Sequence, residues 1–301
     1  MSITAIILVI LSAFLHAEWN LLSKRQHPTA AFFLIASLAG SFLLAPSLFL
    51  YGNMLVQNIP TRIWAHLFAS GFFLALYYIC LAGAYRAGDM SVAYPLARSS
   101  PVIVVTIVTL ILGRGDQVST LCVVGIALVV GGCFLIPLQR VSDLHLKMYV
   151  NPTCGLALLA AIGTAGYSIV DDEALRYLRT CALIGNTQTA LAYACLEALS
   201  ASTWLFVFVM LRRSGRSSLS QLLRAKKRYA VLAGFAIYFA YVLVLISLAF
   251  VNNVSYVVGF RQLSVPLGAI LGIVVLKEAH YAPKIAGIIV MFVGLILVAV
   301  G

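Results

Sequence analysis

The stretch PLGAILGIVVLKEAHYAPKIAGIIVMFVG, residues 266–294, runs from a proline through an apolar segment to an acid and then to a second apolar segment. Residues 101–132 have the same order, although three more residues separate the proline from the acid. In both stretches two glycines follow the acid by nine and sixteen residues: Gly125 and Gly132 after Asp116, and Gly287 and Gly294 after Glu278. This shared spacing predicts that the chain contains two copies of one structural unit.

The composition indicates a membrane protein. Of 301 residues, 62% are hydrophobic and only 10% are charged, which is too little polar surface for a soluble domain. A helix that crosses a bilayer needs about 20 mostly apolar residues. Segments of that length predict ten membrane-spanning helices, at 3–22, 30–50, 64–85, 91–112, 118–138, 152–170, 182–210, 229–250, 255–276 and 283–300. The connections between them are too short for a soluble catalytic or nucleic-acid-binding domain.

The repeat extends over the whole chain. The end of the first predicted span, AEWNLLSK at 17–24, aligns with AGYSIVDD at 165–172 in the sixth. We therefore predict two halves of five spans each, residues 1–138 and 152–301, joined by a connecting loop at 139–151. Because five is odd, the second half must be inverted in the membrane relative to the first. Inverted repeats are a recurring architecture of transporters, in which the substrate binds near the midplane between the halves.

The basic residues predict an orientation in the membrane. Basic loops resist translocation, so the side that carries most Lys and Arg faces the cytoplasm. Most of the basic residues outside the spans lie in alternate loops on one side, seven of them in RRSGRSSLSQLLRAKKR at 212–228. The other side carries four, Arg62, Arg114, Arg176 and Arg179. With an even number of spans, both termini are expected to face outward in a multi-pass protein of the bacterial inner (plasma) membrane.

These features together resemble the EamA family of the drug/metabolite transporter superfamily. The likeness lies in two five-helix halves, each ending in a proline, an apolar run, an acid and a helix with two glycines seven residues apart. It implies an all-α carrier of ten membrane helices that works by alternating access, with a central cavity lined mainly by the first, third, fourth, sixth, eighth and ninth helices. The chain departs from the family at GRGD, residues 113–116, where a glycine followed by glutamate is usual. The outward termini also differ from the inward arrangement expected of many relatives.

Charged residues within membrane spans are costly, so they are usually paired or face a cavity. The predicted spans hold four clear cases, Glu18, Arg98, Glu197 and Arg261. Arg98 and Arg261 lie on repeat-related helices, and a guanidinium group offers a fork of donors that fits a carboxylate or a phosphate. We therefore expect both arginines to bind an anionic group of the substrate. The alternative is that each forms a structural ion pair with Glu197 or Glu18.

The first span carries polar residues that could also serve the substrate site. Glu18 has no acidic counterpart in the repeat, and a carboxyl group partly removed from water can exchange a proton for a cation. One interpretation is that Glu18 binds the substrate or couples protons. The alternative is that Glu18 pairs with an arginine or contacts interfacial water. His16 could relay protons or pack through a hydrogen bond, and Asn20 shares its helix face. Trp19, the repeat mate of Tyr167, is a substrate platform or an interfacial anchor.

Tyrosines recur in the predicted third, fourth, eighth and ninth spans, and Tyr167 lies in the sixth. Some of them could line a cavity, because aromatic walls with a few polar groups suit small solutes, while others would pack or lie at the interface. The candidates for the substrate site are Tyr78, Tyr94, Tyr167 and Tyr241.

The remaining acids are expected to be structural. Glu197 lies in the seventh helix, which the resemblance makes peripheral, so we expect it to be a structural partner. Asp171 follows the sixth predicted span and is expected in a solvated cluster at a helix end. Asp116 and Glu278 lie at helix junctions, where contacts that cap a helix or close a gate are expected over substrate binding.

The sequence has no pattern that indicates catalysis. No nucleophile–base pair, metal-ligand cluster or ATP-binding motif stands out, so we expect no enzyme activity, no cofactor and no bound metal. The hypothesis is a secondary active transporter of a small polar organic metabolite, with a carboxylate or phosphate group favoured. The alternatives are proton-coupled efflux of a cationic or zwitterionic compound through Glu18, and a non-transporting scaffold or assembly protein whose charges pair and leave no cavity. The expected partners are the small-molecule substrate and the lipid bilayer, without nucleic acid, and a homodimer stays open.

Overall fold

The computed structural model of the chain describes residues 3–56, 59–101, 103–104, 107, 119–144, 149–181, 185–225, 227–247 and 263–300. Within these ranges all regular secondary structure is helical. The elements are α1 (Ile3–Arg25), α2 (Ala30–Val56), α3 (Thr61–Ala87), α4 (Met90–Ser99), α6 (Thr120–Leu135), the short 3₁₀ helix η2 (Val141–Asp143), α7 (Pro152–Cys181), α8 (Asn186–Leu211), α9 (Arg213–Ala225), α10 (Lys227–Ser247), α12 (Ser264–Val275) and α13 (Ala282–Val300). The predicted all-α class is therefore confirmed for the described residues.

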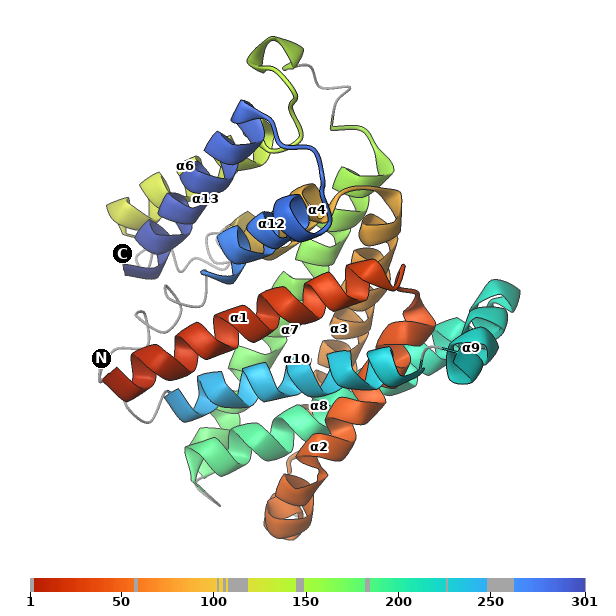
Figure 1. Ribbon diagram of the computed structural model, residues 1–301. Helices are drawn as coiled ribbons and strands as arrows, with labels where there is room; N and C mark the ends of the chain where they lie inside the picture. Colours follow the sequence, from red (N-terminus) through yellow and green to blue (C-terminus); the bar gives the residue numbers. More distant parts are fainter. Residues whose placement is uncertain are drawn as a thin grey trace.

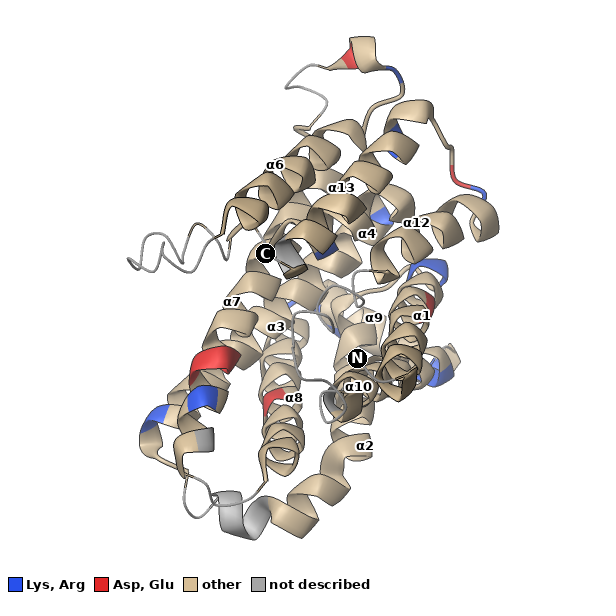
Figure 2. Cartoon of the chain, turned by 90° about the vertical axis from the view of Figure 1, so that its left-hand side faces the viewer, with Lys and Arg blue, Asp and Glu red and all other residues tan. Residues whose placement is uncertain are grey.

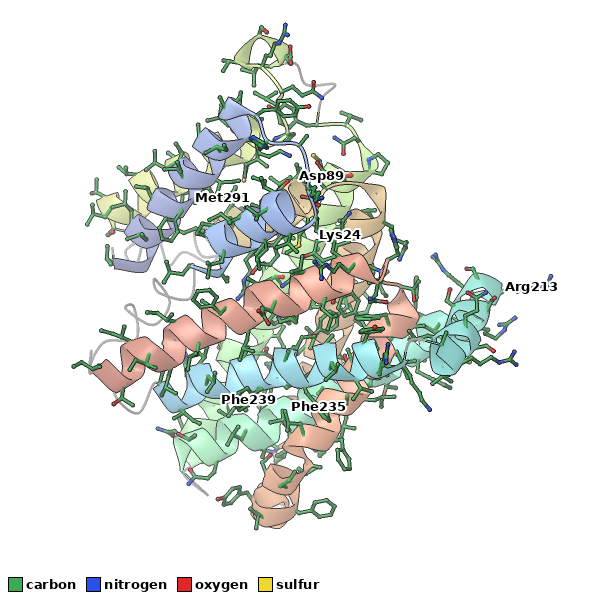
Figure 3. All side chains as sticks on the ribbon, viewed as in Figure 1. Lys24, Asp89, Arg213, Phe235, Phe239 and Met291 are labelled. Atoms are coloured by element: carbon green, nitrogen blue, oxygen red, sulfur yellow. The ribbon has the colours of Figure 1, made fainter. Side chains whose placement is uncertain are left out.

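Most of these helices are suited to a bilayer. In the described part of the chain, six are long and apolar enough to cross a membrane, and α6, α12 and α13 are shorter apolar helices. Large apolar side chains cover the outward faces: Phe49 is 85% exposed and Phe42 is 77% exposed. Phe235 and Phe239 lie on the exposed side of α10 (Figure 3). Such a surface suits lipid, and the chain is an integral, multi-pass membrane protein.

The helices pack in pairs that join the first half of the chain to the second. α1 lies along α10, α3 lies along α7, and α2 packs on α8. In Figure 1, α1, α10 and α8 run side by side, with α3 and α7 behind them. On the other side of α1, α4 packs against α12 and α6 packs against α13. The two halves therefore interleave and do not form separate bodies.

Glycines allow α6 and α13 to approach closely. A Cβ atom at Gly132 would lie 2.6 Å from the carbonyl oxygen of Gly287, and one at Gly294 would lie 2.6 Å from that of Gly125. The glycines that define the sequence repeat thus meet one another across this helix pair. Glycine at a helix interface permits such a close approach of two backbones.

Two segments differ from the helix ends that we predicted. α7 continues to Cys181, well past residue 170, so Asp171 lies inside the helix. The expected solvated cluster at a helix end is wrong for this residue, because the segment DDEALRYLR favours helix beyond the apolar run. The basic connection after α8 contains α9, whose Arg213 projects from the molecule (Figure 3).

Candidate functional site

A cavity of about 540 Å³ lies between helices of both halves. Its walls come from α1, α3, α4, α7, α8 and α10, with one lining residue from α13. Most of the lining side chains are aromatic or apolar, and a few polar groups converge on the space, as is typical of a site for a small solute. The polar and charged lining residues apart from the tyrosines are His16, Arg98, Ser99, Thr164, Ser168, Asp171, Asp172 and Glu197.

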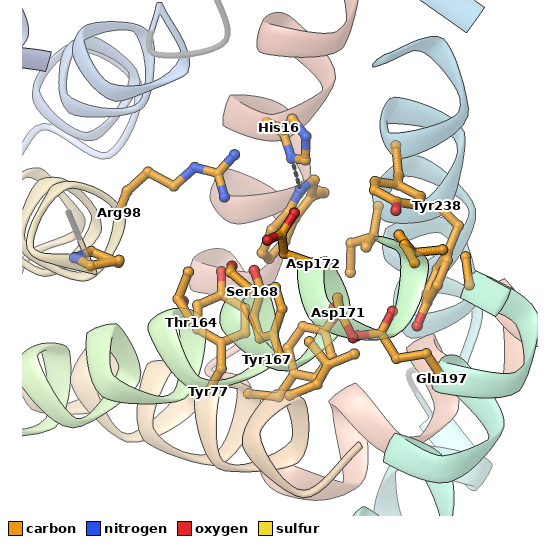
Figure 4. A pocket seen from close by; sticks show the side chains of 18 of the residues that line it. His16, Tyr77, Arg98, Thr164, Tyr167, Ser168, Asp171, Asp172, Glu197 and Tyr238 are labelled. Atoms are coloured by element: carbon orange, nitrogen blue, oxygen red, sulfur yellow. Dashed lines mark hydrogen bonds between the residues drawn. The ribbon is translucent and has the colours of Figure 1, made fainter. Parts of the chain in front are cut away.

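Arg98 of α4 extends its guanidinium group into this cavity (Figure 4). Four tyrosines, Tyr94, Tyr167, Tyr77 and Tyr85, lie near its charge. Among the described residues no carboxylate lies within 4.0 Å of the guanidinium, so Arg98 does not form the ion pair with Glu197 or Glu18 that was the structural alternative. The next residue, Ser99, is fully buried, and its hydroxyl has no hydrogen-bond partner in the described structure.

The polar residues of α1 divide between the cavity and its surroundings. His16 and Trp19 line the cavity, and Trp19 Nε1 donates to His16 Nδ1 at 3.2 Å. Trp19 is only 3% exposed, so it is a wall residue and the interfacial-anchor interpretation is wrong. Asn20 lies behind the wall, where its Oδ1 accepts from the Tyr85 hydroxyl at 2.6 Å. Glu18 lies on the exposed side of α1 and outside the cavity wall.

Three of the four tyrosine candidates line the cavity and one does not. Tyr78, Tyr167 and Tyr241 line the cavity. Tyr94 does not, because its ring packs against α12, where a Cβ atom at Gly268 would lie 2.3 Å from a ring carbon. Arg261, the repeat mate of Arg98, lies outside the described residues.

Two acids that we placed in structural roles line the cavity wall as well. Asp171 Oδ1 lies 2.6 Å and Glu197 Oε1 lies 3.2 Å from the same hydroxyl, that of Ser70 on α3. The hydroxyl of Tyr193 donates to Asp171 Oδ1 at 2.8 Å. Acidic residues therefore occur on α7 and α8 within the bundle (Figure 2). The prediction that Glu197 is peripheral is wrong, because α8 packs on α3 with this side chain toward the cavity.

A family comparison concerns the first half of the chain, which contributes α1, α3 and α4 to the cavity wall. The model of the EamA-like transporter family matches residues 3–138. Residues 3–138 belong to the EamA-like transporter family. The resemblance is thus confirmed over these residues, and this family implies a membrane transporter of the drug/metabolite type.

The fold comparison extends over the whole chain. A solved structure titled "Crystal structure of protein" covers 99% of this chain and 97% of its own, with a TM-score of 0.54 and 17% sequence identity. At that identity the likeness concerns the fold alone. No curated protein matches the chain.

The EamA-matched half is joined to the second half at the start of α4. The carboxylate of Glu278 accepts from the backbone N–H groups of Met90 and Ser91 at 2.6 and 2.7 Å. A carboxylate there satisfies free N–H groups of the first helical turn and complements the helix dipole. The capping role predicted for Glu278 is confirmed, while Asp116 lies outside the described residues. This contact fixes the helix from which Arg98 reaches the cavity.

Two lysines lie at this junction, and one of them, Lys284, joins the halves. Lys284, which is 3% exposed, donates to the Ser91 hydroxyl at 3.1 Å and forms an ion pair with Asp89 at 3.5 Å. Lys24 donates to the backbone carbonyl of Tyr85 at 2.6 Å and lies near Asp89 (Figure 3). These contacts hold the ends of α1, α3, α4 and α13 together.

Proposed function

We propose that the chain is a secondary active transporter of a small polar organic metabolite that bears a carboxylate or phosphate group. The observation that carries this proposal is Arg98, which reaches the cavity and has no carboxylate partner among the described residues. A buried cation without a counter-charge is costly in a membrane. A bound anion would neutralise the guanidinium through paired hydrogen bonds.

The cavity supports a substrate of metabolite size. Its volume of about 540 Å³ lies within the range of roughly 300–1,000 Å³ that is usual for small-molecule pockets. Ser99, Thr164 and Ser168 bring hydroxyl groups to the wall near the aromatic residues. These hydroxyls would bind polar substituents of the solute, while the tyrosine rings would pack against its carbon skeleton.

We further propose ten spans in two inverted five-helix repeats, with the halves at 1–138 and 152–301. Support comes from the packing. The repeat mates are α1 and α7, α2 and α8, α3 and α10, α4 and α12, and α6 and α13. Exchange of each helix for its mate turns the contact of α1 with α10 into that of α7 with α3. It also turns the contact of α2 with α10 into that of α8 with α3. All four contacts exist, while α6 with α13 and α4 with α12 map onto themselves. A two-fold axis between the halves would produce this pattern.

Alternating access requires an end of the cavity that can close. The contacts of Glu278 and Lys284 join elements of both halves at the side of the basic loops, and Lys24 joins the ends of α1 and α3 beside them. We propose that they form the closed gate on that side, that this side is cytoplasmic, and that both termini face outward from a bacterial inner membrane. Transport would then require that these contacts break while the opposite end closes.

A second candidate is efflux of a cationic or zwitterionic compound, which is favoured by the two carboxyl groups in the same cavity wall. Such a substrate would place a positive group beside Asp171 and Glu197. The proposed part of Glu18 in proton coupling stays a prediction, although its exposed position on α1 separates it from the cavity.

The test compares melting temperatures of the detergent-purified full chain with inorganic phosphate, succinate, glutamate and choline. A ligand stabilises the folded state by mass action, by about 2.7 kcal/mol at one hundred times its Kd. We expect phosphate or succinate to raise the melting temperature of the wild type and of Arg213→Ala, an exposed arginine on α9, but not of Arg98→Ala. An undiminished shift in Arg98→Ala would overturn the anion site. Stabilisation by choline alone would favour the second candidate.

A further inference from the structure

We infer that Asp171 and Glu197 together bind the proton that this carrier couples to its substrate. The pair joins three helices: Asp171 comes from α7, Glu197 from α8, and Ser70 from α3 lies between them. Its role in transport rests on the function proposed above, whereas its capacity to bind a proton rests on the geometry of the three side chains.

The hydrogen bonds around the pair leave one carboxyl group short of a donor. Ser70 Oγ lies 2.6 Å from Asp171 Oδ1 and 3.2 Å from Glu197 Oε1, yet a hydroxyl has only one hydrogen to donate. Tyr193 gives its hydrogen to the same Asp171 oxygen. Two carboxylates that meet at one hydroxyl repel each other, and a single proton between them removes that repulsion.

No fixed positive charge replaces the proton. Within the described ranges, neither acid of the pair has a lysine or arginine within 4.0 Å. The other titratable or charged groups that line the cavity with the pair are His16 from α1, Tyr77 and Tyr78 from α3, Arg98 from α4, Tyr167 and Asp172 from α7, and Tyr238 and Tyr241 from α10, while Tyr193 from α8 bonds to Asp171. Of these, only Arg98 carries a permanent positive charge, and it is not in ion-pair contact. Two acids in a membrane without such a partner need a mobile cation.

The wall beside the pair carries a further buried polar group. Tyr238 is 6% exposed, and its hydroxyl lies close to the side chains of Ser37 and Tyr78. Tyr238, Asp171 and Glu197 all line the cavity. The cavity therefore gives a proton a route to the pair.

The shared cavity gives the proton its role. An anion held by Arg98 and a proton held by the pair attract each other, and the attraction is strong where water is scarce. The two ligands therefore favour the same conformation and would cross the membrane in the same direction. In each cycle a carboxylate oxygen takes a proton from cavity water on one side and returns it to water on the other. The carrier is thus a proton–anion symporter.

Infrared spectroscopy of the purified full chain tests the pair without any solute. The C=O stretch of a protonated carboxyl group is recorded between about pH 5 and 8, where solvated carboxyl groups are already ionised. We expect a protonated band in the wild type, and we expect it to be absent from Asp171→Asn/Glu197→Gln. Glu173→Gln, an acid on α7 paired with Arg62, and Glu18→Gln serve as matched controls that should keep the band.

The outcomes separate this inference from the proposed function. A wild type without the band, or a double variant that keeps all of it, would overturn the proton site. Loss of the band in Glu18→Gln alone would transfer the site to α1. Should the double variant not fold, Ser70→Ala provides a second test, because loss of the shared donor should shift the pH at which the band disappears. The dependence of anion binding on Arg98 is measured separately, so either result can fail while the other stands.

Discussion

At the scale of single residues, the contact between α1 and α3 depends on one buried hydroxyl. Tyr85 is fully buried and its hydroxyl donates to Asn20 Oδ1 at 2.6 Å, while Asn20 Nδ2 donates to the carbonyl of His16. This chain of bonds leads directly to a residue of the cavity wall. The hydroxyl therefore supports the position of His16 as well as the packing of the two helices.

We predict that Tyr85→Phe lowers the melting temperature of the purified protein. Without the hydroxyl, Asn20 Oδ1 is left unsatisfied at a site that is 1% exposed, and such a loss costs about 1–3 kcal/mol. Tyr229→Phe is the control, because its hydroxyl contacts the side chain of Arg228 at the surface. Equal melting temperatures for the two variants would show that the Tyr85 hydroxyl contributes nothing to stability.

Residue identity predicted part of the site. His16, Trp19, Tyr78, Arg98, Tyr167 and Tyr241 were candidates from the sequence and line the cavity. Asp171 was misplaced because the apolar run ends before the helix does. The sequence identifies Glu197 as a charge within the membrane, but it does not show that the helix of this residue borders the cavity. Which face of a helix meets the cavity depends on packing between distant segments, and a single sequence does not state that packing.

At the scale of elements, α6 and α13 provide a matched pair of glycines. A Cβ atom at Gly132 would lie within 3.0 Å of the backbone of α13, whereas one at Gly131 meets nothing within 4 Å. The two positions are adjacent in the same helix, so they share lipid environment and helix propensity. They differ only in whether the partner helix is in contact.

We predict that Gly132→Ala destabilises the protein and that Gly131→Ala does not. The first substitution forces the two backbones apart, and overpacking of this kind costs about 1–3 kcal/mol. The second adds a methyl group in open space and gains up to about 1 kcal/mol of helix propensity. Thermal unfolding of both variants in the same detergent measures the difference. If Gly131→Ala were the more damaging change, the contact between α6 and α13 would be incorrect.

Most elements were predictable because an apolar run of span length determines a membrane helix almost by itself. The ends were less certain, as the continuation of α7 to Cys181 shows, because polar helix formers extend a helix beyond the lipid. The glycine spacing predicted a repeat, but only the folded chain shows that the glycines of the two copies meet between α6 and α13.

At the scale of the whole molecule, the packing pattern makes a topological prediction. If each half has five spans, a reporter fused after Leu144, in the predicted connecting loop, lies on the opposite side of the membrane from one fused after Gly301. The basic loops assign Leu144 to the cytoplasm, because loops rich in Lys and Arg are retained there. A green fluorescent protein fusion should therefore fluoresce at Leu144 and not at Gly301, and alkaline phosphatase should be active only at Gly301. If the same reporter were active at both Leu144 and Gly301, the two sites would lie on one side of the membrane, and the inverted repeat would be refuted. Opposite sides with the two assignments exchanged would keep the repeat and reverse the orientation, and the gate at Lys24, Glu278 and Lys284 would then face outward.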